Sequence, residues 1–197
     1  MVFEHLYLVI VSCFFVVALG VPIGIFTYYH PKAGQVVLTV VDLLQTVPVL
    51  AVMGLLMTVF GANSVTVIIS MVLYLLLPIV RNTNTGLNSV SPILKETADA
   101  MSMNRWQRLK DVEFPMAFSF ILTGIRIAVV TAVGVAVFGT FVGGGGLGSI
   151  LYRGIRTQNF DLIISGTLVL MLMSVFFDYF LGFLEKKQGG IYEKTEK

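Results

Sequence analysis

The sequence predicts an all-α polytopic membrane protein with about five transmembrane helices and one structured cytoplasmic loop. Hydrophobic residues make up 56% of the 197 residues, and charged residues make up 12%, about half of the roughly 25% usual in soluble domains. The few charges are clustered, and long apolar runs separate the clusters. A soluble domain of this size buries too little of its surface to hide that much apolar material.

Five apolar runs are long enough to cross a bilayer, because about 20 helical residues span a hydrocarbon core of about 30 Å. Backbone groups in lipid must be satisfied within their own segment, so these runs are predicted to be helices. The predicted spans are 5–28, 36–59, 64–85, 116–141 and 161–184. The first run carries Glu4 in place of a basic flank and is too long for a cleaved signal peptide.

The distribution of Lys and Arg predicts the orientation of the chain. Ten of the 13 Lys and Arg residues lie in three places: between spans one and two, from the end of span three to the start of span four, and in the last twelve residues. Because cytoplasmic loops carry the excess of Lys and Arg, we expect a multi-pass membrane protein whose 86–115 loop is cytoplasmic. Its N-terminus would lie outside and its C-terminus in the cytoplasm. The predicted organisation is one transmembrane domain, 1–185, with a cytoplasmic tail, 186–197.

The loop 91–115, which we call the knob, carries the densest charge and is predicted to form two short helices. Ser91 followed by Pro92 is typical of a helix start. Asn104 is predicted to cap the second helix, with a glutamine three residues later in the capping-box position. The apolar face of the first helix and the large side chain of Trp106 favour docking into a groove of a partner protein. A solvated loop that only follows the charge rule is the alternative.

Three stretches of the knob form a pattern: Glu96-Thr97-Ala98, Ser102 and Val112-Glu113-Phe114-Pro115. The pattern resembles the EAA loop of ABC importer permeases. Glu96, Ala98 and Pro115 match that loop, and the other positions depart from it, Ser102 standing where the family has a glycine. In the family this loop is the coupling helix that docks on a cytoplasmic ATPase. The resemblance implies that the ATPase contact is formed by Glu96, Ala98, Ser102, Arg105, Trp106 and Pro115.

Further segments resemble the permeases of osmoprotectant importers, which carry quaternary amines such as glycine betaine, carnitine and choline. They are 43–48, 77–86, 98–107, 144–148 and 152–155. The resemblance implies a second permease, identical or homologous, cytoplasmic ATPase subunits and a separate extracellular substrate-binding protein. ATP and Mg would then be bound by the ATPase, so this chain would be no enzyme and would hold no cofactor or metal. Membrane lipid is a further expected partner, no nucleic acid is expected, and the resemblance implies a bacterial plasma (inner) membrane.

Two other functions remain open. A methionine or other amino-acid importer permease is the close alternative and differs only in cargo. A channel-like membrane subunit is the more distant one, because it would not explain the structured knob. An intramembrane enzyme would need a motif such as HExxH or paired aspartates within the spans, and the sequence has neither.

Polar residues inside the spans are candidates for a translocation pathway because they are costly in lipid. Asp42, Gln45 and Thr46 are predicted to point toward one region, just before Pro48 interrupts the helix. Aromatic faces hold quaternary ammonium groups, and Tyr74 on span three is the nearest candidate. Bonding between helices is the alternative for Gln45 and Thr46. Hydration near the cytoplasmic end of the span is the alternative for Asp42.

Two further intramembrane charges and a glycine run complete the candidates. Arg126 is predicted to pair with Asp42 or a backbone carbonyl, and Asp178 to have a structural role near Lys186 and Lys187. The glycine run lacks the ending of a phosphate-binding loop and is predicted to form an outer gate or a seat for the binding protein, with a plain tight loop as the alternative. The residues of this loop are Gly143, Gly144, Gly145, Gly146 and Gly148.

Overall fold

The computed structural model describes residues 1–193 and confirms the all-α fold. Side chains are described up to residue 187. The helices are α1 (Val2–Tyr29), α2 (Pro31–Thr46), α3 (Val49–Phe60), α4 (Ser64–Ser89), α5 (Pro92–Ala100), α6 (Arg105–Arg108), the π-helical turn η1 (Leu109–Glu113), α7 (Phe114–Val135), the 3₁₀ segment η2 (Ala136–Val142), α8 (Gly148–Arg156) and α9 (Phe160–Glu193).

Four stretches are long and apolar enough to cross a membrane, and the pair α2–α3 supplies a fifth span if it is counted as one. The four stretches contain α1, α4, α7 and α9, and they confirm four of the predicted spans. The second predicted span, 36–59, is broken at Pro48, where the sequence predicted an interruption, and α2 and α3 are bent by 95° at the break. Pro48 lacks the N–H that would continue the helix, and Val47 before it is extended.

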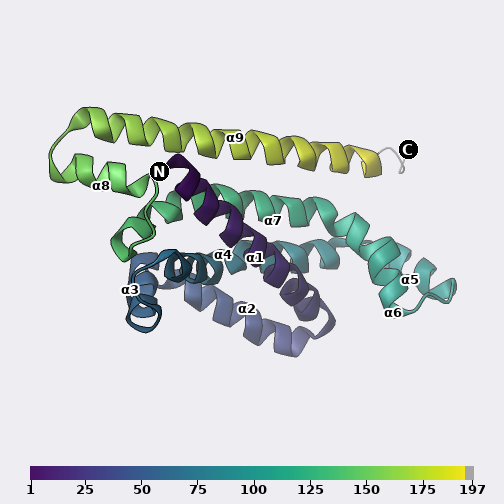
Figure 1. The fold of residues 1–197 in the computed structure, drawn as a ribbon. Helices are drawn as coiled ribbons and strands as arrows, with labels where there is room; N and C mark the ends of the chain where they lie inside the picture. Colours follow the sequence, from purple (N-terminus) through teal and green to yellow (C-terminus); the bar gives the residue numbers. More distant parts are fainter. Residues whose placement is uncertain (194–197) are drawn as a thin grey trace.

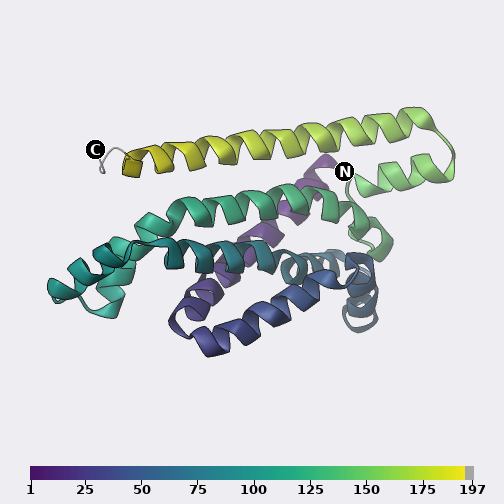
Figure 2. The same ribbon diagram turned by 180° about the vertical axis from the view of Figure 1, so that it is seen from behind.

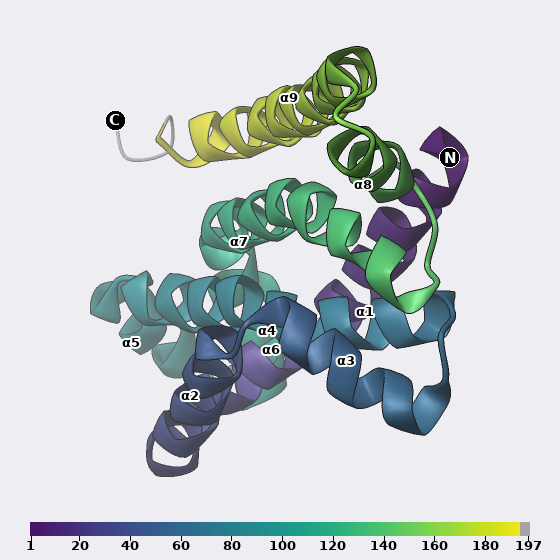
Figure 3. The same ribbon diagram turned by 90° about the vertical axis from the view of Figure 1, so that its left-hand side faces the viewer.

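Helix α4 lies at the centre of the fold (Figure 1) and packs against α1, α2, α3 and α7. Helix α1 crosses α4 obliquely, and α9 runs beside α7 (Figures 1 and 2). Viewed from the side in Figure 3, α8 and α9 lie on one side of the bundle and α2 and α3 on the other. The main core cluster therefore draws its buried side chains chiefly from α1, α4 and α7.

Glycine brings α1 and α4 into close contact. A Cβ atom added at Gly24 would lie 2.5 Å from Cβ of Thr83 on α4, and no side chain fits that space. Membrane helices associate largely by van der Waals packing, so small residues at a crossing allow the backbones to approach. Gly24 therefore determines how closely the first span lies against the central helix.

The two ends of the bundle differ. Helices α5 and α6 and the end of α9 lie at one end, which we call the knob end (Figures 1 and 2). The start of α1 and helix α8 lie at the opposite end. Helix α9 runs on to Glu193, so residues 186–193 of the predicted tail continue the last helix. The last four residues of that predicted tail lie outside the described range.

Candidate functional site

The knob forms as two short capped helices. Ser91 is the N-cap of α5, with Pro92 at its first turn, although the Ser91 side chain forms no capping hydrogen bond. Asn104 caps α6 in a full capping box. The Gln107 backbone N–H donates to Asn104 Oδ1, and the Asn104 backbone N–H donates to Gln107 Oε1, each over 2.9 Å. The predicted helix start and capping box are both confirmed.

The turn between α5 and α6 uses the left-handed region. Ser102 has a φ of 60°. Its backbone N–H donates to the Asp99 carbonyl over 2.9 Å, and the Met103 N–H donates to the Ala98 carbonyl over 3.1 Å, which is the Schellman pattern that ends many helices. Glycine adopts this conformation without strain. Ser102 stands where the EAA loop that the knob resembles has a glycine, and its backbone geometry is one that glycine would favour.

The knob presents both charged and apolar side chains on its surface. Glu96, Ser102 and Arg105 are exposed, and Trp106 is 69% exposed. Ala98 instead lies inside the knob, with 2% of its surface exposed. The exposed apolar side chains Ile93 and Met101 extend the surface, and Pro115 is half-buried in the first turn of α7. An exposed surface of this composition is typical of a protein-binding face.

A buried carboxylate links the knob to the end of α1. Glu113 is fully buried. The hydroxyl of Tyr28 donates to its Oε1 over 2.9 Å, and the hydroxyl of Tyr29 donates to its Oε2 over 3.0 Å. Arg108 Nε forms an ion pair with Glu113 Oε1 at 3.0 Å, and its Nη1 donates to Asp99 of α5 over 2.8 Å. We call Tyr28, Tyr29, Asp99, Arg108 and Glu113 the carboxylate cluster.

Sequence reasoning did not find the carboxylate cluster. Two signals were available. Glu113 lies four residues after Leu109, so both fall on the buried face of one helical turn. Tyr28 and Tyr29 end the first span, where buried hydroxyls need a partner. Neither signal names the pairing, because Glu113 on η1 is more than 80 residues from Tyr28 and Tyr29 on α1.

The predicted pathway residues on α2 lie close to the bend between α2 and α3. Asp42, Gln45 and Thr46 lie in its last two turns, just before the 95° break. Asp42 is paired with Arg81 on α4, whose Nη2 donates to Asp42 Oδ2 over 2.7 Å. The Thr46 hydroxyl donates to the Leu43 carbonyl of its own helix over 2.7 Å. Tyr74 is half-buried and packs against the main core cluster on α4.

The predicted partner of Arg126 is wrong. Arg126 on α7 donates from Nε to Asp178 Oδ1 over 2.7 Å and from Nη1 to Glu185 Oε2 over 3.2 Å. Both acceptors lie on α9, which runs beside α7. Asp178 therefore has a structural role, as expected, but with Arg126 and not with the lysines that follow it. Asp42 lies on α2 and pairs with Arg81.

The glycine loop is held against the start of α1. Gly143, Gly145 and Gly146 have φ values of 71° to 79°, which residues other than glycine rarely adopt. The Gly146 N–H donates to Glu4 Oε2 over 3.1 Å. A Cβ atom at Gly148 would lie within 2.1 Å of the Val137 carbonyl oxygen. The loop therefore needs glycine both for its turns and for close backbone approach.

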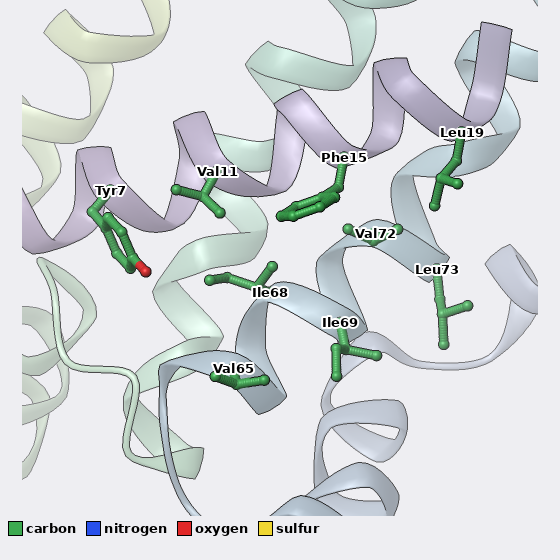
Figure 4. A pocket seen from close by; sticks show the side chains of 9 residues that line it. All are labelled: Tyr7, Val11, Phe15, Leu19, Val65, Ile68, Ile69, Val72 and Leu73. Atoms are coloured by element: carbon green, nitrogen blue, oxygen red, sulfur yellow. The ribbon is translucent and has the colours of Figure 1, made fainter.

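An apolar groove lies between α1 and α4 (Figure 4). It has a volume of about 560 Å³. Its lining is apolar apart from the Tyr7 hydroxyl and consists of Tyr7, Val11, Phe15, Leu19, Val65, Ile68, Ile69, Val72 and Leu73. A charged solute would lose its hydration in such a groove without gaining a polar partner. We therefore do not assign it to cargo.

The described chain is a bundle of apolar spans with a capped two-helix knob at one end, the architecture of a membrane-embedded subunit. Residues 17–190 match the family model of the binding-protein-dependent transport system inner membrane component, and the chain belongs to that family.

Two relatives and one solved structure extend this assignment. The chain is 39% identical over 193 residues to the glycine betaine/carnitine/choline transport system permease protein OpuCD of Bacillus subtilis, covering 98% of this chain and 84% of the relative. It is 38% identical over 192 residues to the choline transport system permease protein OpuBD of the same organism, covering 97% and 85%. The fold is similar to inward-facing conformations of the MetNI methionine ABC transporter, with a TM-score of 0.84, 20% identity and coverage of 94% and 93%.

Proposed function

We propose that this chain is the permease subunit of an ABC importer that moves quaternary-amine osmoprotectants, such as glycine betaine, carnitine and choline, into the cell. The observation that carries the cargo assignment is the 39% identity, over 98% of this chain, to a relative whose name specifies these compounds. The 38% identity to a choline permease agrees with it. The methionine transporter shares the fold at 20% identity, and identity at that level does not favour methionine as the cargo.

In this proposal the knob is the docking surface for a cytoplasmic ATPase. Glu96, Ser102, Arg105 and Trp106 are exposed and would form the contact. Ala98 is buried and Pro115 half-buried, so they would act by holding the shape of the surface. ATP and Mg would be bound by the ATPase. The knob end would then face the cytoplasm, and the start of α1 and the glycine loop would face outward.

The pathway would run between this permease and a second one, identical or homologous. Asp42, Gln45, Thr46 and Tyr74 stay predictions for its lining. The glycine loop, held by Glu4 at the outward end, stays a prediction for the outer gate or the seat of a separate binding protein. Both assignments agree with the placement of α2 beside the central helix and of the loop at the end opposite the knob.

The test is ATP hydrolysis by the complete complex in liposomes, with its ATPase and binding protein. We expect glycine betaine, carnitine or choline to stimulate hydrolysis above the rate without cargo. A complex without the binding protein is the control and should not respond. Stimulation by methionine alone would overturn the cargo assignment and leave the importer assignment intact. If no ATPase co-purifies with the permease, the importer assignment itself is overturned.

A further inference from the structure

We infer that Glu113 is a positioning residue that fastens the knob to the end of α1, so that movement of the knob is transmitted to α1 as well as to α7. The inference rests on the proposed function, because it assumes that an ATPase moves the knob. It concerns how that movement reaches the membrane helices.

The burial of Glu113 shows that the contact is built into the fold. An ionised carboxylate out of water is costly unless it is paired and hydrogen-bonded. Glu113 is fully buried, and both of its oxygens have partners. Oε1 accepts from Tyr28 and lies 3.0 Å from Arg108 Nε, and Oε2 accepts from Tyr29. The carboxylate, on the last residue of η1, therefore joins α1 and α6 at the point where the chain enters α7.

Helix α5 enters the same cluster by two further contacts. Asp99 on α5 accepts from Arg108 over 2.8 Å. Lys95 on α5 lies over the Tyr28 ring, with Nζ 5.0 Å from the ring centroid, a cation–π geometry. Tyr28 is thus held at its hydroxyl by Glu113 and at its ring by Lys95. Both helices of the knob are consequently tied to the end of α1.

The opposite end of α1 is also fixed by polar contacts. Glu4 accepts from the Gly146 N–H over 3.1 Å, and His5 Nε2 lies 3.0 Å from the Val133 carbonyl oxygen. Between these ends α1 packs along α4 in the main core. A helix held at both ends and packed in between moves as a rod, so α1 connects the knob to the glycine loop. Without the carboxylate cluster, the covalent path through η1 into α7 and apolar packing would remain.

The two tyrosine hydroxyls can be removed without removing the rings. Tyr28 and Tyr29 pack with their rings against a second core cluster that includes Leu87, Leu109 and Ile121. The double variant Tyr28→Phe/Tyr29→Phe keeps this packing and deletes both hydrogen bonds to Glu113. Glu113→Gln keeps the shape and deletes the charge that faces Arg108. Tyr179→Phe on α9, where the side chain is 76% exposed, is the matched control.

The experiment measures uptake and ATP hydrolysis together in liposomes that contain the whole complex. We expect the double phenylalanine variant and Glu113→Gln to assemble with the ATPase and to hydrolyse ATP. Uptake per ATP hydrolysed should fall about fivefold or more, the range of typical coupling between sites. Tyr179→Phe should keep the wild-type ratio. Because they break the same contact, Tyr28→Phe and Glu113→Gln combined should lose less than the product of their separate losses.

Three outcomes would overturn the inference. One is a wild-type ratio of uptake to hydrolysis in both variants. Another is loss of assembly in both, which would show that the cluster only holds the fold. The third is multiplicative losses in the combined variant. Failure of the proposed function would look different, because the wild-type complex itself would then lack an ATPase or fail to take up quaternary amines.

Discussion

Ser102 shows how one residue can carry local strain in a turn. Its φ of 60° lies in the left-handed region, which costs a residue with a Cβ about 1–2 kcal/mol. The two backbone hydrogen bonds that close the Schellman pattern hold it there. The strain is local to the tip of the knob, so it can be relieved without changing the helices on either side.

We expect Ser102→Gly to stabilise the permease by no more than about 1 kcal/mol, because glycine relieves the strain but has more freedom in the unfolded chain. Ser102→Val should destabilise it, since a β-branched side chain fits this region poorly. Ser102→Ala is the matched control and should stay near wild type. Thermal unfolding of the purified permease in detergent measures all three, and equal midpoints for glycine and valine would contradict the argument.

The charges inside the spans are paired within the bundle. Arg126 meets Asp178 and Glu185 on α9, and Asp42 meets Arg81 on α4. A charge in a membrane span is tolerated where it meets an opposite charge or lines a cavity. Each of these contacts therefore ties together two helices that are distant in sequence.

Close packing of α1 on α4 is a property of the elements and depends on Gly24. The space opposite Gly24 is filled by Thr83 on α4, so any side chain there forces the helices apart. Gly54 on α3 has nothing within 4 Å of the position of an added Cβ. The two glycines both lie in helices, and only their surroundings differ.

We expect Gly24→Ala to lower the thermal midpoint of the permease, because overpacking a tight contact typically costs about 1–3 kcal/mol. Gly54→Ala should be neutral or raise the midpoint, since alanine is the better helix former by about 1 kcal/mol. The comparison uses the same chemical change at two sites. A midpoint unchanged or raised in Gly24→Ala would show that the helices separate without cost.

The bend between α2 and α3 is a second element-scale feature. A proline within an apolar run predicts an interruption, and the sequence located it at Pro48. The 95° angle depends on how α2 and α3 pack against α4, which the local sequence does not encode. The predicted pathway residues Asp42, Gln45 and Thr46 all precede this bend.

For the whole molecule, the knob stands as a separate two-helix unit at one end of the bundle. Its two helices are joined by the Asp99–Arg108 ion pair, and Ala98 and Leu109 are buried. Its exposed face carries Glu96, Arg105 and Trp106. On the proposed function, changes to that face and changes to the interior of the knob should both disturb docking of the ATPase, for different physical reasons.

We expect Glu96→Lys to abolish uptake by reversing an exposed charge on the docking face. Ala98→Asp should have the same effect, because a carboxylate placed at a position with 2% exposure disrupts the interior of the knob. Both variants should remain in the membrane, since no span is altered. Co-purification with the ATPase and uptake in liposomes measure the effects.

The matched control is Arg156→Glu, a charge reversal on α8 at the opposite end of the bundle. It should leave the amount of co-purifying ATPase unchanged. Normal ATPase assembly together with normal uptake in both knob variants would contradict the assignment of the knob as the docking surface.

The sequence alone determined the fold class, four of the spans, the two helices of the knob and the capping box of Asn104. Each of these depends on a signal within one segment: an apolar run of sufficient length, a cap residue at the right spacing, or a proline at a helix start. The serine at position 102, where the EAA loop has glycine, also indicated the turn between α5 and α6. Such features are local, so the chain can be interpreted one segment at a time.

Only the tertiary structure decided which side chains meet. The partners of Arg126 and Asp42, the 95° bend, and the contact of Glu113 with Tyr28 and Tyr29 were not determined by the sequence. Each depends on the rotation of one helix about its axis and on its packing against a helix far away in the chain. A shift of one residue turns a side chain by about 100° around a helix of 3.6 residues per turn, so the partner of a polar side chain is fixed only when the whole bundle packs.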